Sequence, residues 1–202
     1  MGDGRTAGRT IPLSDFYLAK PGDSVQRINL QLAQGKHLLL TPGMYDIDRW
    51  RTNIGRKDAV INGDGVVATG LFVEHFPQHD TTWNGENGTV VLYQNELPYD
   101  PPTQADWMTT DGTLGWAGSK VGDDVKNHKL FGAGVYVFNQ NNPAIRTSNG
   151  FQVRRRSGVK LHHIMTVNLS AGVIDHVVNG VGGPADTTKI GVPVYVNDYP
   201  AP

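Results

Sequence analysis

The stretch VINGDGVVATGLFV at residues 60–73, followed by TVVLY at residues 89–93, decides the fold. Each piece is a short run rich in β-branched residues, and turn-forming Asn, Gly and Asp separate the runs. Similar runs recur further along, at residues 135–138, 159–161, 164–167 and 173–174. No window after residue 58 shows the 3.6-residue apolar period of an amphipathic helix. This part of the chain is therefore predicted to be all-β.

Comparable strands recur at a nearly constant spacing. Gly65-Val66 and Gly88-Thr89 are 23 residues apart, and Gly134-Val135 and Gly158-Val159 are 24 apart. A period of this size is typical of a stacked solenoid. Amides at equivalent turns of successive coils can bond along such a stack, and Asn stands beside strands at positions 62, 95, 139, 168 and 179. We predict a right-handed parallel β-helix, and a β-sandwich or jelly roll is the alternative.

A short helix precedes the strands. Asp23-Ser24 supplies an N-cap, and Val25, Ile28 and Leu32 fall on one face of a 3.6-residue period. Gly35 suits the left-handed position after the helix. The pattern predicts a helix over residues 24–34, which would cap the open end of the stack.

The domain organisation follows from composition. Residues 1–20 begin with a Gly/Arg/Thr-rich segment and are predicted to be a mobile lead-in, with residues 21–202 forming a single β-helix domain. The Pro-rich segment LPYDPP at residues 97–102 cannot continue a ladder, so a long loop is expected over about residues 97–118.

The composition excludes several classes of function. With 18 Lys+Arg against 19 Asp+Glu, the chain lacks the basic surplus that nucleic acid or an anionic membrane surface requires. It has no Cys, so a thiolate metal site and a cysteine nucleophile are excluded, and its histidines lack metal-site spacing. No apolar run approaches the roughly 20 residues of a membrane helix. We expect a monomer without metal or cofactor. The opening residues MGDGR do not have the pattern of a secretory signal.

Three segments carry a resemblance to a known group. Residues 22–45 (GDSVQRIN through GKHLLLTPGMY), residues 60–75 and residues 83–100 resemble pectin-lyase-like parallel β-helix proteins of actinobacteria and filamentous fungi. That group is secreted and associated with discoidin-type (coagulation factor 5/8) modules, and it is similar to the α-1,3-glucanases (mutanases, mycodextranases). The resemblance implies a secreted protein that acts on or binds a glucan-type polysaccharide.

The chain departs from that group in one respect. Proteins of this type carry several coils between the first coil and the Asn-Gly-Asp turn, whereas here residues 45–48 run almost directly into residues 58–61. The chain resembles a shortened form of the family. The glucanases also carry a pair of adjacent catalytic Asp residues, and here Gly65 follows Asp64, so that pair is not intact.

Four carboxylates are candidates for catalysis. Glycoside hydrolysis needs two carboxyl groups about 5–9.5 Å apart, and adjacent coils of a β-helix are about 4.8 Å apart. Glu74 and Glu96 are 22 residues apart, and so are Asp64 and Glu86, so each pair matches one coil. Turn carboxylates that only bond nearby backbone amides are the alternative interpretation.

The candidate sugar contacts combine aromatic planes with amides. Sugar rings pack on aromatic faces while amides bond their hydroxyl groups. The expected contacts are His75, Trp83, Asn84, Tyr93, Gln94, Asn95, Tyr99 and Trp107. Trp116 belongs to the same set of aromatic residues, and filling of the core is the alternative role for each of them.

Three functions are compatible with these residues. The first is a glycoside hydrolase that uses paired carboxylates in a groove. The second is a non-catalytic glycan-binding or structural β-helix that has lost coils and activity. The third, a polysaccharide lyase, would need a basic residue near the substrate acid, for which Lys120 is the candidate.

Overall fold

A computed structural model describes residues 12–40, 59–61 and 63–201. The chain divides into two compact units, Met1–Gly55 and Arg56–Pro202. Two predicted features lie outside the described residues. One is the short connection at residues 41–58 that follows the first coil, and the other is the turn position of Asn62.

The first unit is small. It contains η1 (Leu13–Asp15), β1 (Phe16–Ala19), α1 (Val25–Ala33) and β2 (His37–Leu40), and β1 pairs with β2 in parallel. The Ser24 hydroxyl accepts the backbone N–H of Arg27 at 3.3 Å, which is an N-cap contact at the predicted start of the helix. Strand β1 falls inside the segment predicted to be a lead-in. A capping role for α1 stays a prediction.

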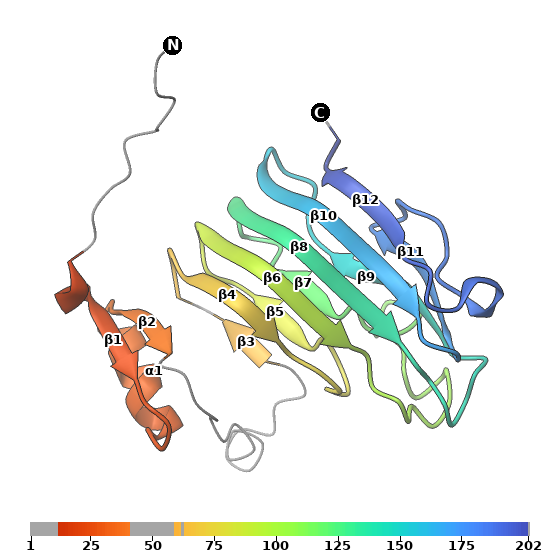
Figure 1. Ribbon diagram of the computed structural model, residues 1–202, viewed down its shortest axis with the longest axis horizontal. Coiled ribbons are helices and arrows are strands. Elements are labelled where there is room, and N and C mark those ends of the chain that lie inside the picture. The colour runs from red at the N-terminus through yellow and green to blue at the C-terminus, as the bar shows by residue number, and fades with distance from the viewer. Residues whose placement is uncertain (1–11, 41–58, 62, 202) are drawn as a thin grey trace. The chain divides into compact units, whose positions relative to one another are not determined.

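The second unit consists of two five-stranded sheets that lie face to face (Figure 1). Their orders are β12-β10-β8-β6-β4 and β11-β9-β7-β5-β3. The strands are β3 (Ala59–Ile61), β4 (Val67–Phe72), β5 (Thr81–Trp83), β6 (Gly88–Glu96), β7 (Ser119–Val121), β8 (Asn127–Val137), β9 (Arg146–Gln152), β10 (Gly158–Asn168), β11 (Val173–Val178) and β12 (Val194–Tyr199), with η2 at Thr187–Lys189.

The chain alternates between the two sheets, so each turn of the chain adds one strand to each sheet. Among the pairings between these described strands, only that of β12 with β10 is antiparallel, and the others are parallel. Parallel pairing of every second strand is consistent with a pectate-lyase-like β-helix, whereas sandwiches pair antiparallel strands. The structure is mostly β with very little helix, as the sequence predicts.

Coil length varies along the stack. Val67 pairs with Thr89, 22 residues later, close to the predicted period. Further on, Gly134 pairs with Met165, and Gly158 pairs with Asn127. The predicted equivalence of Gly134 and Gly158 is therefore wrong, because connections of unequal length separate the strands of the later coils.

In the sheet of order β12-β10-β8-β6-β4, four neighbouring strands have a left-handed residue at the same position. Gly70, Leu92, Gly132 and His163 have φ of 64°, 63°, 65° and 53°. These residues lie opposite one another at a position where neighbouring strands are not paired. In β4 and β6, for example, Thr69 pairs with Val91 and Leu71 pairs with Tyr93, whereas Gly70 and Leu92 between them are not paired. Because each strand has one such residue, the register between strands is kept, while the left-handed backbone shifts the alternation of inward and outward side chains within each strand. In β6, Val90 and Tyr93 both point inward as a result.

The core lies between the sheets and contains several large aromatic side chains. Trp83 is 2% exposed, and a Cβ on Gly88 would come within 2.3 Å of its indole nitrogen. Only glycine permits this close approach. The side chains of Asn95 and Asn139 bond along the stack, because they donate to the backbone carbonyls of Val73 and Pro98 on the preceding coil.

Candidate active site

The structure places Glu74 and Glu96 at matched positions on neighbouring coils. The register Phe72↔Gln94 continues beyond β4, because the backbone N–H of Val73 donates to the Gln94 carbonyl and that of His75 donates to the Glu96 carbonyl. Both glutamates are partly exposed. The two glutamates thus occupy the same backbone position on adjacent coils where β6 ends.

Glu96 is held by two aromatic side chains. The Tyr99 hydroxyl donates a hydrogen bond to Oε2 of Glu96, and the His75 Nε2 atom lies 3.6 Å from the same oxygen. The His75 and Tyr99 ring centroids are 4.4 Å apart. The hydrogen bond to Glu96, followed by burial, raises the pKa of Tyr99 to about 12, so Tyr99 keeps its proton and orients the carboxylate.

The turn after β4, which contains His75, is also bound by a fully buried carboxyl group, that of Asp80. The backbone N–H of Phe76 donates to Oδ1 of Asp80 at 2.7 Å, and Asp80 is 0% exposed. Burial and, to a smaller extent, the nearby charge of Glu74 raise the pKa of Asp80 to about 8. Sequence reasoning missed Asp80, because nothing next to it in the sequence signals its burial.

Asn95 lies beside Asp80 rather than in an open groove. Its amide nitrogen donates to the Val73 carbonyl at 2.6 Å, and the residue is 0% exposed. Its Oδ1 atom and the Oδ2 atom of Asp80 are both buried without a hydrogen-bond partner in the described part of the chain. A proton on Asp80 would supply the missing donor. Asn95 therefore belongs to a buried polar cluster, and it has no exposed surface with which to make the predicted contact with a sugar.

Asp64 and Glu86 make a different arrangement. Oδ1 of Asp64 accepts the backbone N–H of Glu86 at 2.7 Å, and the Glu86 carboxylate accepts the backbone N–H groups of Lys126 and Asn127 at 2.8 and 3.0 Å. These backbone hydrogen bonds, that of Lys126 first, lower the pKa of Glu86. Each carboxylate thus ties its turn to the next coil, which is the alternative interpretation of turn carboxylates.

Most of the predicted aromatic contacts pack the interior. Trp83, Tyr93 and Trp107 are 2%, 2% and 4% exposed, and each donates to a backbone carbonyl, of Gly85, Gly118 and Pro77 respectively. Their faces are not available to a ligand here. Tyr99 and Gln94 are half-buried, and Asn84 is exposed.

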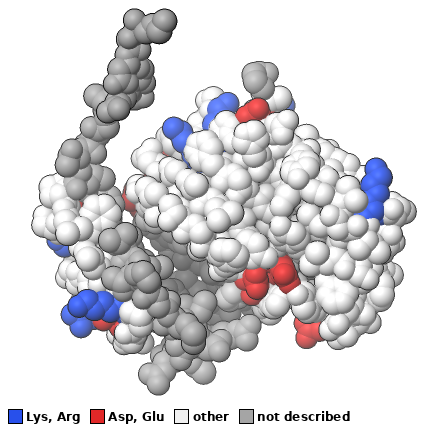
Figure 2. Space-filling model, viewed as in Figure 1, with Lys and Arg blue, Asp and Glu red and all other residues white. Residues whose placement is uncertain are grey.

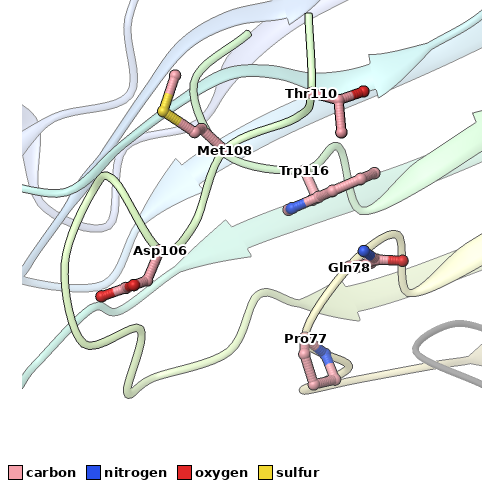
Figure 3. Close-up of a pocket in the computed structure, with 6 residues that line it drawn as sticks. All are labelled: Pro77, Gln78, Asp106, Met108, Thr110 and Trp116. Atoms are coloured by element: carbon pink, nitrogen blue, oxygen red, sulfur yellow. The ribbon is translucent and has the colours of Figure 1, made fainter. Parts of the chain in front are cut away.

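A pocket lies near these residues in the described part of the chain. It has a volume of about 330 Å³ (Figure 3) and is lined by Pro77, Gln78, Asp106, Met108, Thr110 and Trp116. One wall comes from the turn after β4, and the other from the long segment between β6 and β7. Trp116 is half-buried, which makes it the more accessible indole of Trp83, Trp107 and Trp116.

Charged side chains are sparse on the face seen in Figure 2. Among the described residues, no group of three or more His, Asp and Glu side chains could hold a metal ion. No helix in the described ranges is long and apolar enough to cross a membrane. Lys120, the candidate base for a lyase, lies half-buried in β7.

Comparison with known proteins relates the chain to carbohydrate-active enzymes. The profile of the LAM55 pectate lyase-like domain matches residues 16–50 and 48–96. A protein of Streptomyces sp. (strain SirexAA-E / ActE) described as an exo-beta-1,3-glucanase is 28% identical over 317 residues, which covers 98% of this chain and 52% of that protein. These matches support a relationship to a pectate lyase-like glucanase family.

Two solved structures agree with the fold. The structure of sacteLam55A from Streptomyces sp. SirexAA-E has a TM-score of 0.67 and 42% identity over 70% of this chain and 26% of that one. A variant of the same protein in complex with glucose has a TM-score of 0.66 and 43% identity over 70% of this chain and 25% of that one. The chain thus spans about half the length of the exo-beta-1,3-glucanase and about a quarter of the solved structures.

Proposed function

We propose that this chain is a glycoside hydrolase-like β-helix that acts on a glucan, with Glu74 and Glu96 as its paired carboxylates. The observation that carries the proposal is their matched placement on adjacent coils, with both side chains partly exposed. Coils about 4.8 Å apart put such carboxyl groups within the range used by glycoside hydrolases. The relatives, described as an exo-beta-1,3-glucanase and a glucose complex, support a glucan as the substrate.

In this proposal the two glutamates divide the acid role and the base role. Tyr99 holds one oxygen of Glu96 by a hydrogen bond, and His75 lies on the same oxygen, so the carboxylate has a defined orientation. Among the described residues, the Glu74 side chain has no comparable hydrogen bond that fixes its orientation. Asp64 and Glu86, whose oxygens are occupied by backbone amides, serve the turns instead.

Hydrolysis is tested with reducing-sugar release from β-1,3-glucan, α-1,3-glucan, β-1,4-glucan and polygalacturonate. We expect release from β-1,3-glucan, since that is the linkage in the relative's description. Glu74→Gln and Glu96→Gln should each lower the rate by about 10²–10⁴-fold. Asp124→Asn, an exposed carboxylate in a distant turn, is the matched control and should keep the wild-type rate. No release from any glucan would contradict the proposal.

A non-catalytic glycan-binding protein is the second candidate. The observation that favours it is that neither Glu74 nor Glu96 lines the pocket beside Trp116. In that case the chain would bind glucan and release no sugar.

We also infer that the stack has lost coils relative to its relatives. The two segments matched by the family profile meet at residues 48–50, where the sequence predicts the shortening. The alignment with the exo-beta-1,3-glucanase is 317 residues long, which exceeds this chain of 202 residues. Secretion and a monomeric state stay predictions, the second testable by light scattering.

A further inference from the structure

The pocket beside Trp116 has walls that are fixed by hydrogen bonds. The Trp107 indole donates to the Pro77 carbonyl at 3.0 Å, which ties the long loop to the turn after β4. The ring of His79 contacts the Ala117 carbonyl at 2.8 Å and packs edge-on against Trp116, with centroids 5.0 Å apart. The indole that lines the pocket is therefore held in one orientation.

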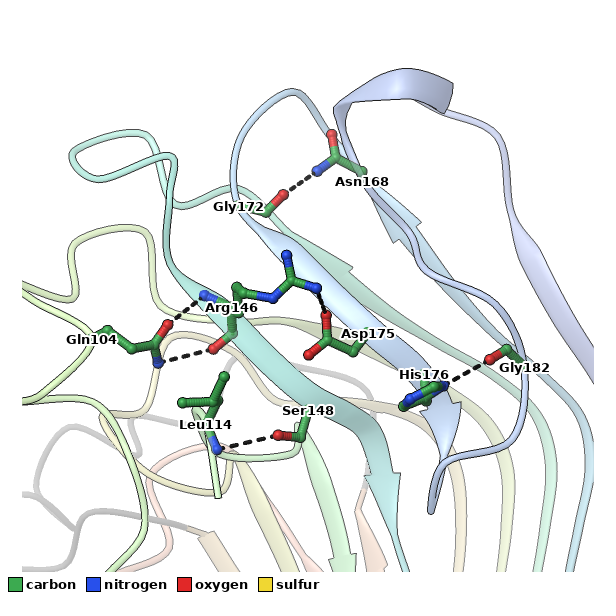
Figure 4. A network of polar contacts seen from close by, with 9 residues as sticks. All are labelled: Gln104, Leu114, Arg146, Ser148, Asn168, Gly172, Asp175, His176 and Gly182. Atoms are coloured by element: carbon green, nitrogen blue, oxygen red, sulfur yellow. Dashed lines mark hydrogen bonds and ion pairs between the residues drawn. The ribbon is translucent and has the colours of Figure 1, made fainter. Parts of the chain in front are cut away.

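The loop is also pinned to strand β9 (Figure 4). The Gln104 side chain accepts the backbone N–H of Arg146 at 2.7 Å and donates to the Arg146 carbonyl at 3.0 Å. Further on, the backbone N–H of Leu114 donates to the Ser148 hydroxyl at 3.2 Å. Because both ends of the lining segment are anchored, the pocket is largely formed before any ligand arrives.

Several polar groups face this pocket with bonding capacity to spare. The Gln78 amide, the Thr110 hydroxyl and the Trp116 indole N–H make no side-chain hydrogen bond with any part of the chain that the structure describes. Figure 3 shows Trp116 between Gln78 and Thr110, with Asp106 to one side. An aromatic plane with amide, hydroxyl and carboxylate groups around it suits a polyhydroxylated ring.

The charge of the pocket favours neutral sugar rings over anionic ones. Asp106 accepts a hydrogen bond from the Thr103 hydroxyl at 2.7 Å, and its carboxylate is the charged group among the lining residues. Among the described residues, no Lys or Arg lines the pocket. An anionic sugar would meet a like charge without a compensating cation, whereas a neutral sugar could donate its hydroxyl groups to Asp106.

We propose that this pocket binds one pyranose ring of a neutral polysaccharide, with the ring packed on Trp116 and bonded by Gln78, Thr110 and Asp106. The site is separate from the paired carboxylates, so it goes beyond the proposed hydrolysis. Pro77 and Gln78 follow Glu74 on the same turn. A bound glucan chain can therefore extend from one site toward the other.

The test is an NMR titration that follows the Trp116 indole N–H resonance. The probes are a β-1,3-linked glucose tetramer and trigalacturonate. The titration is run on the wild type and also on Glu96→Gln, in which slow hydrolysis should not consume the ligand. We expect the neutral tetramer to shift this resonance and trigalacturonate to leave it unchanged. Trp116→Ala should weaken tetramer binding by about tenfold or more, and Trp116→Phe by less.

Asp106→Asn removes the negative charge and should narrow the preference for the neutral tetramer over trigalacturonate. Asp124→Asn is the charge-matched control and should leave both affinities unchanged. Three results would each overturn the proposal. The first is a Trp116 resonance that does not shift with the tetramer, and the second is equal binding of the two probes. The third is an unchanged tetramer affinity in folded Trp116→Phe and Trp116→Ala variants.

The outcome is independent of hydrolysis. Tetramer binding at Trp116 without sugar release would refute the proposed function and support this site. Sugar release that depends on Glu74 and Glu96, with a silent Trp116, would refute this site alone.

Discussion

Replacement of the buried Asp80 by Asn is expected to leave the protein folded and to remove a loss of stability at high pH. Asp80 is 0% exposed, and its Oδ1 atom accepts the Phe76 N–H. Its Oδ2 atom and the Asn95 Oδ1 atom both lack a partner among the described residues. A protonated Asp80 can donate from Oδ2, and the amide of Asn has an N–H donor at the same place.

The magnitude follows from the pKa. Burial raises the pKa of Asp80 to about 8 in the folded state, against about 3.9 in an unfolded chain. Between these values the folded state binds more protons, so the free energy of unfolding falls as pH rises, by about 1.4 kcal/mol per pH unit. The contribution is fully present below about pH 3.9 and is lost once pH passes about 8. The total is about 6 kcal/mol, which is comparable with the whole stability of a small domain.

The assay is urea unfolding at several pH values between 5 and 9 for wild type, Asp80→Asn and Asp124→Asn. The midpoints of wild type and Asp124→Asn should decline with pH in parallel. That of Asp80→Asn should decline less, so its advantage grows toward pH 8. Parallel profiles for wild type and Asp80→Asn would refute the reasoning, because they would show that Asp80 is ionised in the folded state at neutral pH.

Three further changes test the packing of the stack by urea unfolding. Gly88→Ala should destabilise by about 1–3 kcal/mol, because its Cβ would meet the Trp83 ring at 2.3 Å, whereas Gly183→Ala, with open space around it, should be neutral. Gly132→Ala should lose about 1 kcal/mol at its φ of +65°, although nothing lies within 4 Å, and equal stability of Gly132→Ala and Gly183→Ala would contradict the left-handed backbone at Gly132. Burial lowers the pKa of His128 to about 4, so wild type should lose about 3 kcal/mol as pH falls from about 6.5 to 4, and His128→Phe should not. An unchanged acid profile in His128→Phe would count against a buried neutral imidazole.

The first coils were accessible to sequence reasoning, and the later coils were not. The strands on either side of the turn at residues 64–65, and the spacing from Glu74 to Glu96, are set by short connections, so a constant period predicts the pairing of β4 with β6. The segment at residues 97–118 and the connection after β8 have lengths that no pairing rule constrains. For that reason Gly134 pairs with Met165 rather than with the region of Gly158.

The candidate site shows the same division. The two coil-matched pairs of carboxylates were equivalent in the sequence, yet Glu86 caps a turn and Glu96 meets Tyr99 and His75. The difference depends on whether a free backbone amide lies within reach. Similarly, the sequence treats Trp83 and Trp116 alike, but one fills the space above Gly88 and the other lines a pocket.

By itself, the sequence determined that short strands stack with turns of Asn, Gly and Asp between them, and that Glu74 and Glu96 share a position on adjacent coils. These features depend on local propensity and on spacing along the chain. Only the tertiary structure decided that Asp80 is buried, that Glu86 is bound by backbone amides and that Trp116 lines a pocket. Exposure, pKa and hydrogen bonding depend on side chains brought together from segments far apart in the chain, and packing alone sets those distances.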